Sequence, residues 1–102
     1  MDTITSEEFR AHPGVDDWAP GEAGAVGQFR TGNFATGAQL FAAIAELAEE
    51  ADHHPDVDIR YASVRVTLMT HSAGGLTVKD AALAARISDA ARELDIPAER
   101  VT

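Results

Sequence analysis

Three of the four histidines occur in two short segments, residues 53–55 (His-His-Pro) and residues 70–72 (Thr-His-Ser). An imidazole titrates near neutral pH, so it can donate or accept a proton during a reaction. Glu49 precedes His53 by four residues, and a helix that continued this far would place the carboxylate beside the imidazole. Two further acids are close in sequence, Asp52 and Asp80. Together these groups indicate a site for acid–base chemistry.

A helix predicted over residues 34–52 positions the first pair of histidines. Its apolar residues recur with the period of one buried helix face: Leu40, Phe41, Ile44, Leu47, Ala48 and Ala51. Asn33 is a suitable N-cap, and Pro55 prevents the helix from continuing. We therefore expect His53 and His54 at or just past the helix end.

Two strands are predicted within residues 56–71, because apolar and polar residues alternate there. The break near residues 61–63 suggests a tight hairpin. The period of two places His71 at the end of the second strand, on the face of Arg65, Thr67 and Met69.

The remaining elements complete an α+β pattern. Thr5 and Glu8 form a capping-box pair for a short helix within residues 1–13, and Thr77 and Asp80 form one for a helix over residues 78–94. Residues 14–33 predict a loop or poor edge strand around Trp18, then a better strand over residues 25–31. The order α-β-β-α-β-β-α predicts one domain, residues 1–102, with helices on one face of an antiparallel sheet.

Composition limits the function classes. The net charge of −9, from 8 basic and 17 acidic residues, argues against binding nucleic acid or an anionic membrane surface. The chain has no cysteine, which excludes disulfides and thiolate metal sites and fits a reducing cytoplasm. No stretch is long and apolar enough to span a bilayer, and no secretory signal is visible. A chain of 102 residues buries only part of its surface, which favours oligomerisation.

Each candidate residue also has a structural explanation. The helix macrodipole alone favours a histidine near a helix C-terminus, and Asp80 can serve only as a helix cap. Glu49 can lie on a solvated helix face, and Trp18 can belong to the core. The residues alone therefore indicate a possible histidine-rich site in an α+β domain.

The spacing of these residues resembles the signature of the pterin-4a-carbinolamine dehydratase family. That signature has an acidic residue, three residues, His-His-Pro, five residues, an aromatic residue, nine residues, His, and about eight residues to Asp. The positions that meet it are Glu49, His53-His54-Pro55, Tyr61, His71 and Asp80. Residues 70–80, THSAGGLTVKD, are similar to a further family segment. The similarity covers roughly residues 16–94 and is strongest over 49–80.

The resemblance implies an α+β fold with a four-stranded antiparallel sheet and three helices, assembled as a homodimer or homotetramer. It implies conversion of 4a-hydroxytetrahydrobiopterin to quinonoid dihydropterin and water, in tetrahydrobiopterin recycling, with no metal or organic cofactor. The implied catalytic residues are His53, His54, His71 and Glu49, of which His53 and His71 perform acid–base work. The implied pterin contacts are His54, Asp80, Lys79, Trp18 and Asp52. Lys79 stands where many members carry Arg. The compact ammonium group of lysine therefore replaces the planar guanidinium group of arginine.

Two other functions are compatible with the sequence. A non-catalytic protein-binding module of the same fold, similar to the family's dimerisation-cofactor role, would use helix surfaces. A zinc site would use His53, His54 and His71, since three imidazoles resemble a catalytic zinc set.

Overall fold

The computed structural model describes residues 1–101, and Thr102 lies outside the described residues. Its first helix, α1 (Ser6–Arg10), begins with the predicted capping box. The Thr5 hydroxyl accepts from the Glu8 backbone N–H at 3.0 Å, and the Glu8 carboxylate accepts from the Thr5 N–H at 2.8 Å. The helix is shorter than residues 1–13, and it buries Phe9.

An antiparallel hairpin follows, formed by β1 (Trp18–Gly21) and β2 (Gly24–Arg30). Trp18 therefore begins a short strand at the edge of the sheet, which confirms the edge-strand alternative and not the loop. Gly24 needs to be glycine, because its φ is 119° and a Cβ there would lie 2.6 Å from the Leu68 carbonyl oxygen. At Gly27 a Cβ would lie 3.0 Å from the Trp18 indole. Gly24 thus marks a close approach to Leu68 and Gly27 one to Trp18 of β1, and neither glycine interrupts the hairpin.

The long helix α2 (Phe34–Ala51) matches the sequence prediction to within one residue. The Asn33 side chain caps it by accepting from the Thr36 backbone N–H at 2.8 Å. Its C-cap, Asp52, adopts the left-handed conformation with φ 49° and ψ 45°. The buried face carries Leu40, Ile44 and Ala48.

The second predicted hairpin is present as β3 (Asp56–Ile59) and β4 (Ser63–Leu68). The antiparallel sheet has the order β1-β2-β4-β3. A two-residue strand that the sequence did not predict, β5 (Ala98–Glu99), pairs with β2 beyond the end of β1. After β4 the chain forms a 3₁₀ turn, η1 (His71–Ala73).

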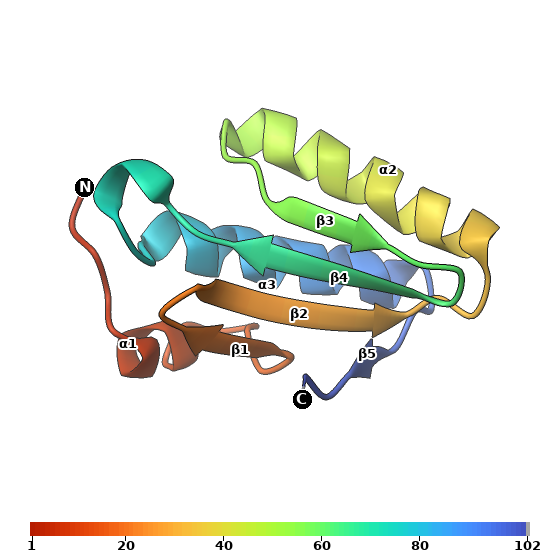
Figure 1. Cartoon of the computed structure of the whole chain (residues 1–102), viewed down its shortest axis with the longest axis horizontal. Helices are drawn as coiled ribbons and strands as arrows, with labels where there is room; N and C mark the ends of the chain where they lie inside the picture. The colour runs from red at the N-terminus through yellow and green to blue at the C-terminus, as the bar shows by residue number, and fades with distance from the viewer. Residues whose placement is uncertain (102) are drawn as a thin grey trace.

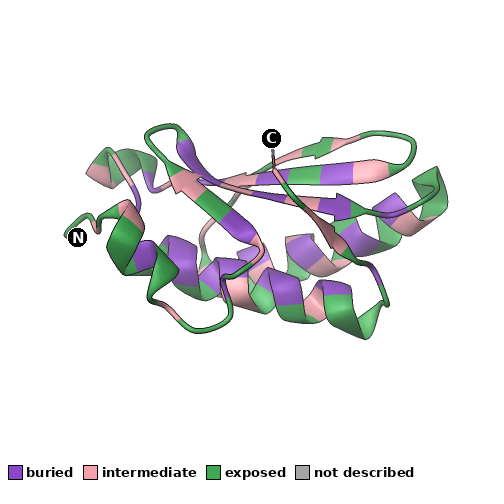
Figure 2. Cartoon of the chain, turned by 90° about the horizontal axis from the view of Figure 1, so that it is seen from below, coloured by how far each residue is buried: buried purple, intermediate pink, exposed green. Residues whose placement is uncertain are grey.

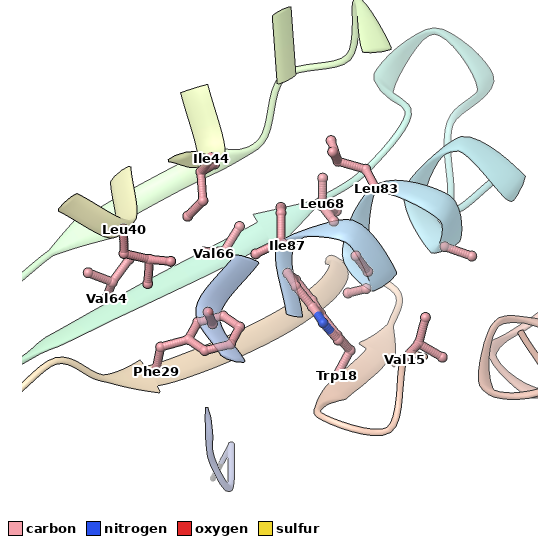
Figure 3. Packing of buried hydrophobic residues seen from close by; sticks show 14 of the residues in the cluster. Val15, Trp18, Phe29, Leu40, Ile44, Val64, Val66, Leu68, Leu83 and Ile87 are labelled. Carbon is pink, nitrogen blue, oxygen red and sulfur yellow. The ribbon is translucent and has the colours of Figure 1, made fainter. Parts of the chain in front are cut away.

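The last helix, α3 (Val78–Glu93), packs beside α2 on one face of the sheet, and Figure 2 shows the helices gathered on that side. The core between the layers includes Trp18 and Phe29 from the first hairpin, Val66 from β4, and Ile87 from α3 (Figure 3). The structure thus confirms the α+β class and the antiparallel sheet.

Three chain ends that matter for the site meet at one end of the molecule. The C-terminus of α2, the exit from β4 with η1, and the N-terminus of α3 lie together at the left of Figure 1. This arrangement brings the two histidine segments and Asp80 to the same end of the sheet.

The opposite face of the sheet is polar. Arg65 Nε donates to Gln28 Oε1 at 2.8 Å, and Arg60 Nε donates to Asp58 Oδ1 at 3.0 Å. The hydrogen bond from Arg60 lowers the pKa of the exposed Asp58 carboxyl. Across residues 1–101, no helix combines the length and apolar character needed to cross a membrane.

Candidate functional site

The carboxylate of Asp80 is the centre of the site. Asp80 is fully buried at the first turn of α3. Its Oδ2 accepts from the Thr77 backbone N–H at 2.9 Å and from the Thr70 hydroxyl at 2.7 Å. Its Oδ1 lies 2.6 Å from His53 Nε2. One buried acid thus completes the predicted helix cap and also contacts an imidazole from another helix end.

His53 reaches Asp80 because α2 stops before it. The left-handed Asp52 turns the chain, and the His53 backbone N–H donates to the Ala48 carbonyl at 3.1 Å. The side chain of His53 is 11% exposed. Since the Asp80 carboxylate accepts at this contact, we assign the proton to Nε2, which leaves Nδ1 as the nitrogen free to exchange a proton.

Glu49 contacts His54, whereas the sequence placed it one helical turn from His53. That expectation needed the helix to continue to His53, and the helix ends at Ala51. Glu49 Oε2 lies 2.5 Å from His54 Nε2, and both side chains are largely exposed. The two histidines therefore have different acids as partners, Asp80 for His53 and Glu49 for His54.

An apolar hollow adjoins the exposed pair. It has a volume of about 270 Å³ and lies between α2 and β3. Glu49 and His54 form its polar side, and Phe41, Ala45, Pro55 and Val57 are among its apolar lining residues. Neither His53 nor His71 lines it. The hollow thus offers an apolar surface beside one imidazole–carboxylate pair.

His71 lies in η1, so it is not a strand residue on the face of Arg65, Thr67 and Met69 as the sequence predicted. The strand β4 ends at Leu68, and the chain then closes a loop in which the N–H groups of Ala73 and Gly74 both donate to the Thr70 carbonyl. His71 is exposed. Its chain neighbour Thr70 touches Asp80, so the structure brings the backbone of His71 beside the His53–Asp80 pair.

A second hollow, of about 450 Å³, lies on the glycine loop that follows His71. Gly74, Gly75 and Leu76 line one side of it, and Thr3 and Ile4 line another. The Ile4 backbone N–H donates to the Leu76 carbonyl at 2.8 Å, which ties the N-terminal segment to this loop.

The remaining predicted contact residues differ in position. Lys79 is exposed in the first turn of α3, and Asp52 is exposed at the C-cap of α2. Trp18 is buried, and its indole N–H donates to Ser88 Oγ at 2.9 Å. Its ring packs edge-on against Phe29 with centroids 6.1 Å apart (Figure 3). This position matches the core explanation for Trp18, and we leave it out of the proposed pterin contacts.

Sequence reasoning did not single out Thr70, although a signal was present. The inward-facing residues Val64, Val66 and Leu68 alternate along β4, and Thr70 is the next position in that series and is also buried. A hydroxyl at a position that the pattern reserves for apolar residues indicates a buried hydrogen-bond network.

For the zinc alternative, the side chains of residues 1–101 contain no group of three or more His, Asp or Glu residues placed to hold a metal ion.

Comparisons with known proteins identify the family and support the fold. A family model described as pterin 4 alpha carbinolamine dehydratase matches residues 2–90. A Chloroflexus aurantiacus protein, provisionally named pterin-4-alpha-carbinolamine dehydratase, is 51% identical over 73 residues, or 72% of this chain and 78% of the relative. A Mycobacterium avium protein with the same provisional name is 36% identical over 89 residues, or 86% of this chain and 95% of the relative. The crystal structure of a transcriptional coactivator/pterin dehydratase from Brucella melitensis matches with a TM-score of 0.78 and 31% identity, covering 86% of this chain and 97% of that chain.

Proposed function

Because the chain belongs to the pterin-4a-carbinolamine dehydratase family, we propose that it removes water from a 4a-hydroxytetrahydropterin to give the quinonoid dihydropterin. The observation that carries the proposal is the contact between His53 and the buried Asp80. A carboxylate that holds one imidazole nitrogen fixes the tautomer and leaves the other nitrogen to exchange a proton, as in other acid–base sites.

The chemistry requires two proton transfers. The C4a–O bond breaks as an acid protonates the departing hydroxyl, and a base removes the proton from N5. We assign these transfers to His53 and His71, which are carried on different elements. His54, held by Glu49, contacts the pterin beside the apolar hollow. The exposed Lys79 and Asp52 contribute further polar contacts, and the fully buried Asp80 acts through His53. The proposed reaction involves no change of redox state, so the proposal includes no cofactor.

The test is a dehydration assay with freshly generated 4a-hydroxytetrahydropterin, following formation of the quinonoid product. We expect His53→Ala and His71→Ala each to lower kcat by about 10²–10⁴, the range typical of general acid–base groups. His12→Ala is the matched control, because His12 lies in the loop after α1 and contacts the Pro13 carbonyl. Wild-type turnover in both of the first two variants, on folded protein, would refute the proposal.

A second candidate function has one specific observation in its favour, which is the dual name of the Brucella melitensis structure as coactivator and dehydratase. On this alternative the chain is a protein-binding module that needs no pocket chemistry. Purified protein that leaves carbinolamine dehydration at its uncatalysed rate, but forms a stable complex with a second protein, would favour it.

The proposal takes residues 1–102 as one domain that acts in the cytoplasm as a homodimer or homotetramer. Its acidic net charge of −9 is consistent with a small-molecule substrate in place of nucleic acid or a membrane surface.

A further inference from the structure

We propose that Thr70 is a positioning residue, whose hydroxyl ties the segment carrying His71 to the His53–Asp80 pair. Thr70 is only 7% exposed, and its Oγ1 has two polar neighbours within hydrogen-bond distance. These are Asp80 Oδ2 at 2.7 Å and Thr77 Oγ1 at 2.8 Å. The kinetic part of this inference rests on the proposed dehydratase function.

Counting protons fixes the direction of this network. A threonine hydroxyl has one proton, and the Thr70 proton goes to Asp80. Thr77 must then donate its own hydroxyl proton to Thr70. Thr77 Oγ1 also accepts from the Lys79 backbone N–H at 3.3 Å, as a helix cap should. The hydroxyl of Thr77 thus donates to Thr70, and the hydroxyl of Thr70 donates to the Asp80 carboxylate, where the network ends. His53 Nε2 donates to the other carboxylate oxygen.

The helix cap alone does not explain the Thr70 bond. The Thr77 backbone N–H already anchors Asp80 Oδ2 at 2.9 Å, so the capping box forms without Thr70. The Thr70 bond adds a connection between the exit of β4 and the start of α3. This bond fixes the exit of β4 relative to the start of α3, whereas the capping box stabilises only the start of α3.

The same residue organises the backbone around His71. The Thr70 N–H donates to the Gly75 carbonyl at 3.1 Å, and the Thr70 carbonyl accepts from the N–H groups of Ala73 and Gly74. Consecutive Cα atoms are about 3.8 Å apart, so a shift of Thr70 moves His71 with it. The Thr70 hydroxyl thus sets how the His71 segment lies relative to His53, and a misplacement of about 1 Å between reacting groups can cost up to about 10² in rate.

The variants Thr70→Val and Thr70→Ser separate the hydroxyl from the shape of the side chain. Valine keeps the branched shape without the hydroxyl, and serine keeps the hydroxyl. We expect Thr70→Val to lower kcat by about 10-fold to 100-fold with little change in KM, and Thr70→Ser to stay near the wild type. Thr67→Val is the control, because Thr67 is a half-buried residue of β4 whose neighbours in the strand, Val66 and Leu68, point into the core.

NMR of ¹⁵N-histidine-labelled protein gives a readout that does not depend on turnover. In the wild type and in Thr70→Ser, His53 is expected in the single Nε2–H tautomer. In Thr70→Val the Asp80 carboxylate loses one anchor, and a mixture of tautomers is expected. If the wild type has no dehydratase activity, the proposed function fails while the tautomer comparison still decides the role of Thr70.

The inference is overturned by a folded Thr70→Val protein that keeps the wild-type kcat and the single His53 tautomer. Should that variant fail to fold, the wild type itself provides the test. The Thr70 hydroxyl proton should be protected from exchange and show a cross-peak to the His53 ring, and a rapidly exchanging hydroxyl would equally overturn the inference.

Discussion

At the start of α3, Asp80 accepts hydrogen bonds from the Thr77 backbone and the Thr70 hydroxyl, and its second oxygen faces His53. The Thr77 and Thr70 contacts are buried, so these two donors cannot turn to water if the carboxylate is removed, whereas His53 is 11% exposed. Glu49 and His54 form a pair of the same chemical type on the surface, where both groups are solvated. The two pairs should therefore differ strongly in their effect on stability.

Asp80→Asn is expected to lower the free energy of unfolding by about 1–3 kcal/mol, because its amide offers one acceptor oxygen where the carboxylate offers two, so the donors on one side lose their acceptor. Glu49→Gln should change it by less than about 0.5 kcal/mol, as is usual for an exposed ion pair. Urea denaturation followed by the fluorescence of Trp18, the one tryptophan, measures both values. Equal losses in the two variants would contradict the assignment of Asp80 as the buried anchor.

At the scale of elements, Gly27 of β2 packs directly against the Trp18 ring, and a Cβ there would lie 3.0 Å from three ring carbons. Gly27→Ala should destabilise the protein by about 1–3 kcal/mol, because the added methyl overpacks a rigid indole. Gly21→Ala is the matched control in the same hairpin, since its Cβ would meet only the Gly24 carbonyl at 3.9 Å. Thermal unfolding of the two variants tests this, and a neutral Gly27→Ala would show that the indole can move.

Local sequence rules predicted the elements whose signals lie within the element itself. The caps at Thr5, Asn33 and Thr77 were correct, because a cap is a contact between residues two or three positions apart. The alternation of β4 was also correct, since period alone determines it. The buried face of α2 was correct at Leu40, Ile44 and Ala48, but Phe41, which the pattern placed on that face, is 42% exposed.

Local sequence patterns could not predict features that depend on contacts between residues far apart in the chain. The strand β5 has two residues and exists only against β2. Glu49 contacts His54, and not His53 as expected, because the left-handed Asp52 ends α2. Local sequence did not indicate this left-handed turn, since aspartate is a weaker signal for the left-handed conformation than glycine is. The contact of Thr70 with Asp80 joins β4 to α3, and no local pattern specifies such a pair.

At the scale of the whole molecule, α2 is apolar on more than its buried side. Phe34 and Phe41 are 59% and 42% exposed, and they lie seven residues apart on the same helix face. Ala38, Ala42 and Ala45 continue this surface, while Glu46 and Glu50 lie on the side of α2 that meets Arg86 of α3. A small domain gains stability by covering such a surface. We therefore place the proposed homo-oligomer contact on the apolar outer face of α2.

Phe41→Glu is expected to reduce the assembly, because it places a charge on the face that must be desolvated when two copies meet. Gln39→Glu adds the same charge on the polar side of α2 and should leave the assembly intact. Light scattering coupled to gel filtration measures the mass relative to the 10.8 kDa chain. The wild-type melting temperature should also rise with protein concentration, since association stabilises the folded state by mass action. A wild type that scatters as a single chain, with a melting temperature independent of concentration, would contradict the proposed homo-oligomer contact on α2.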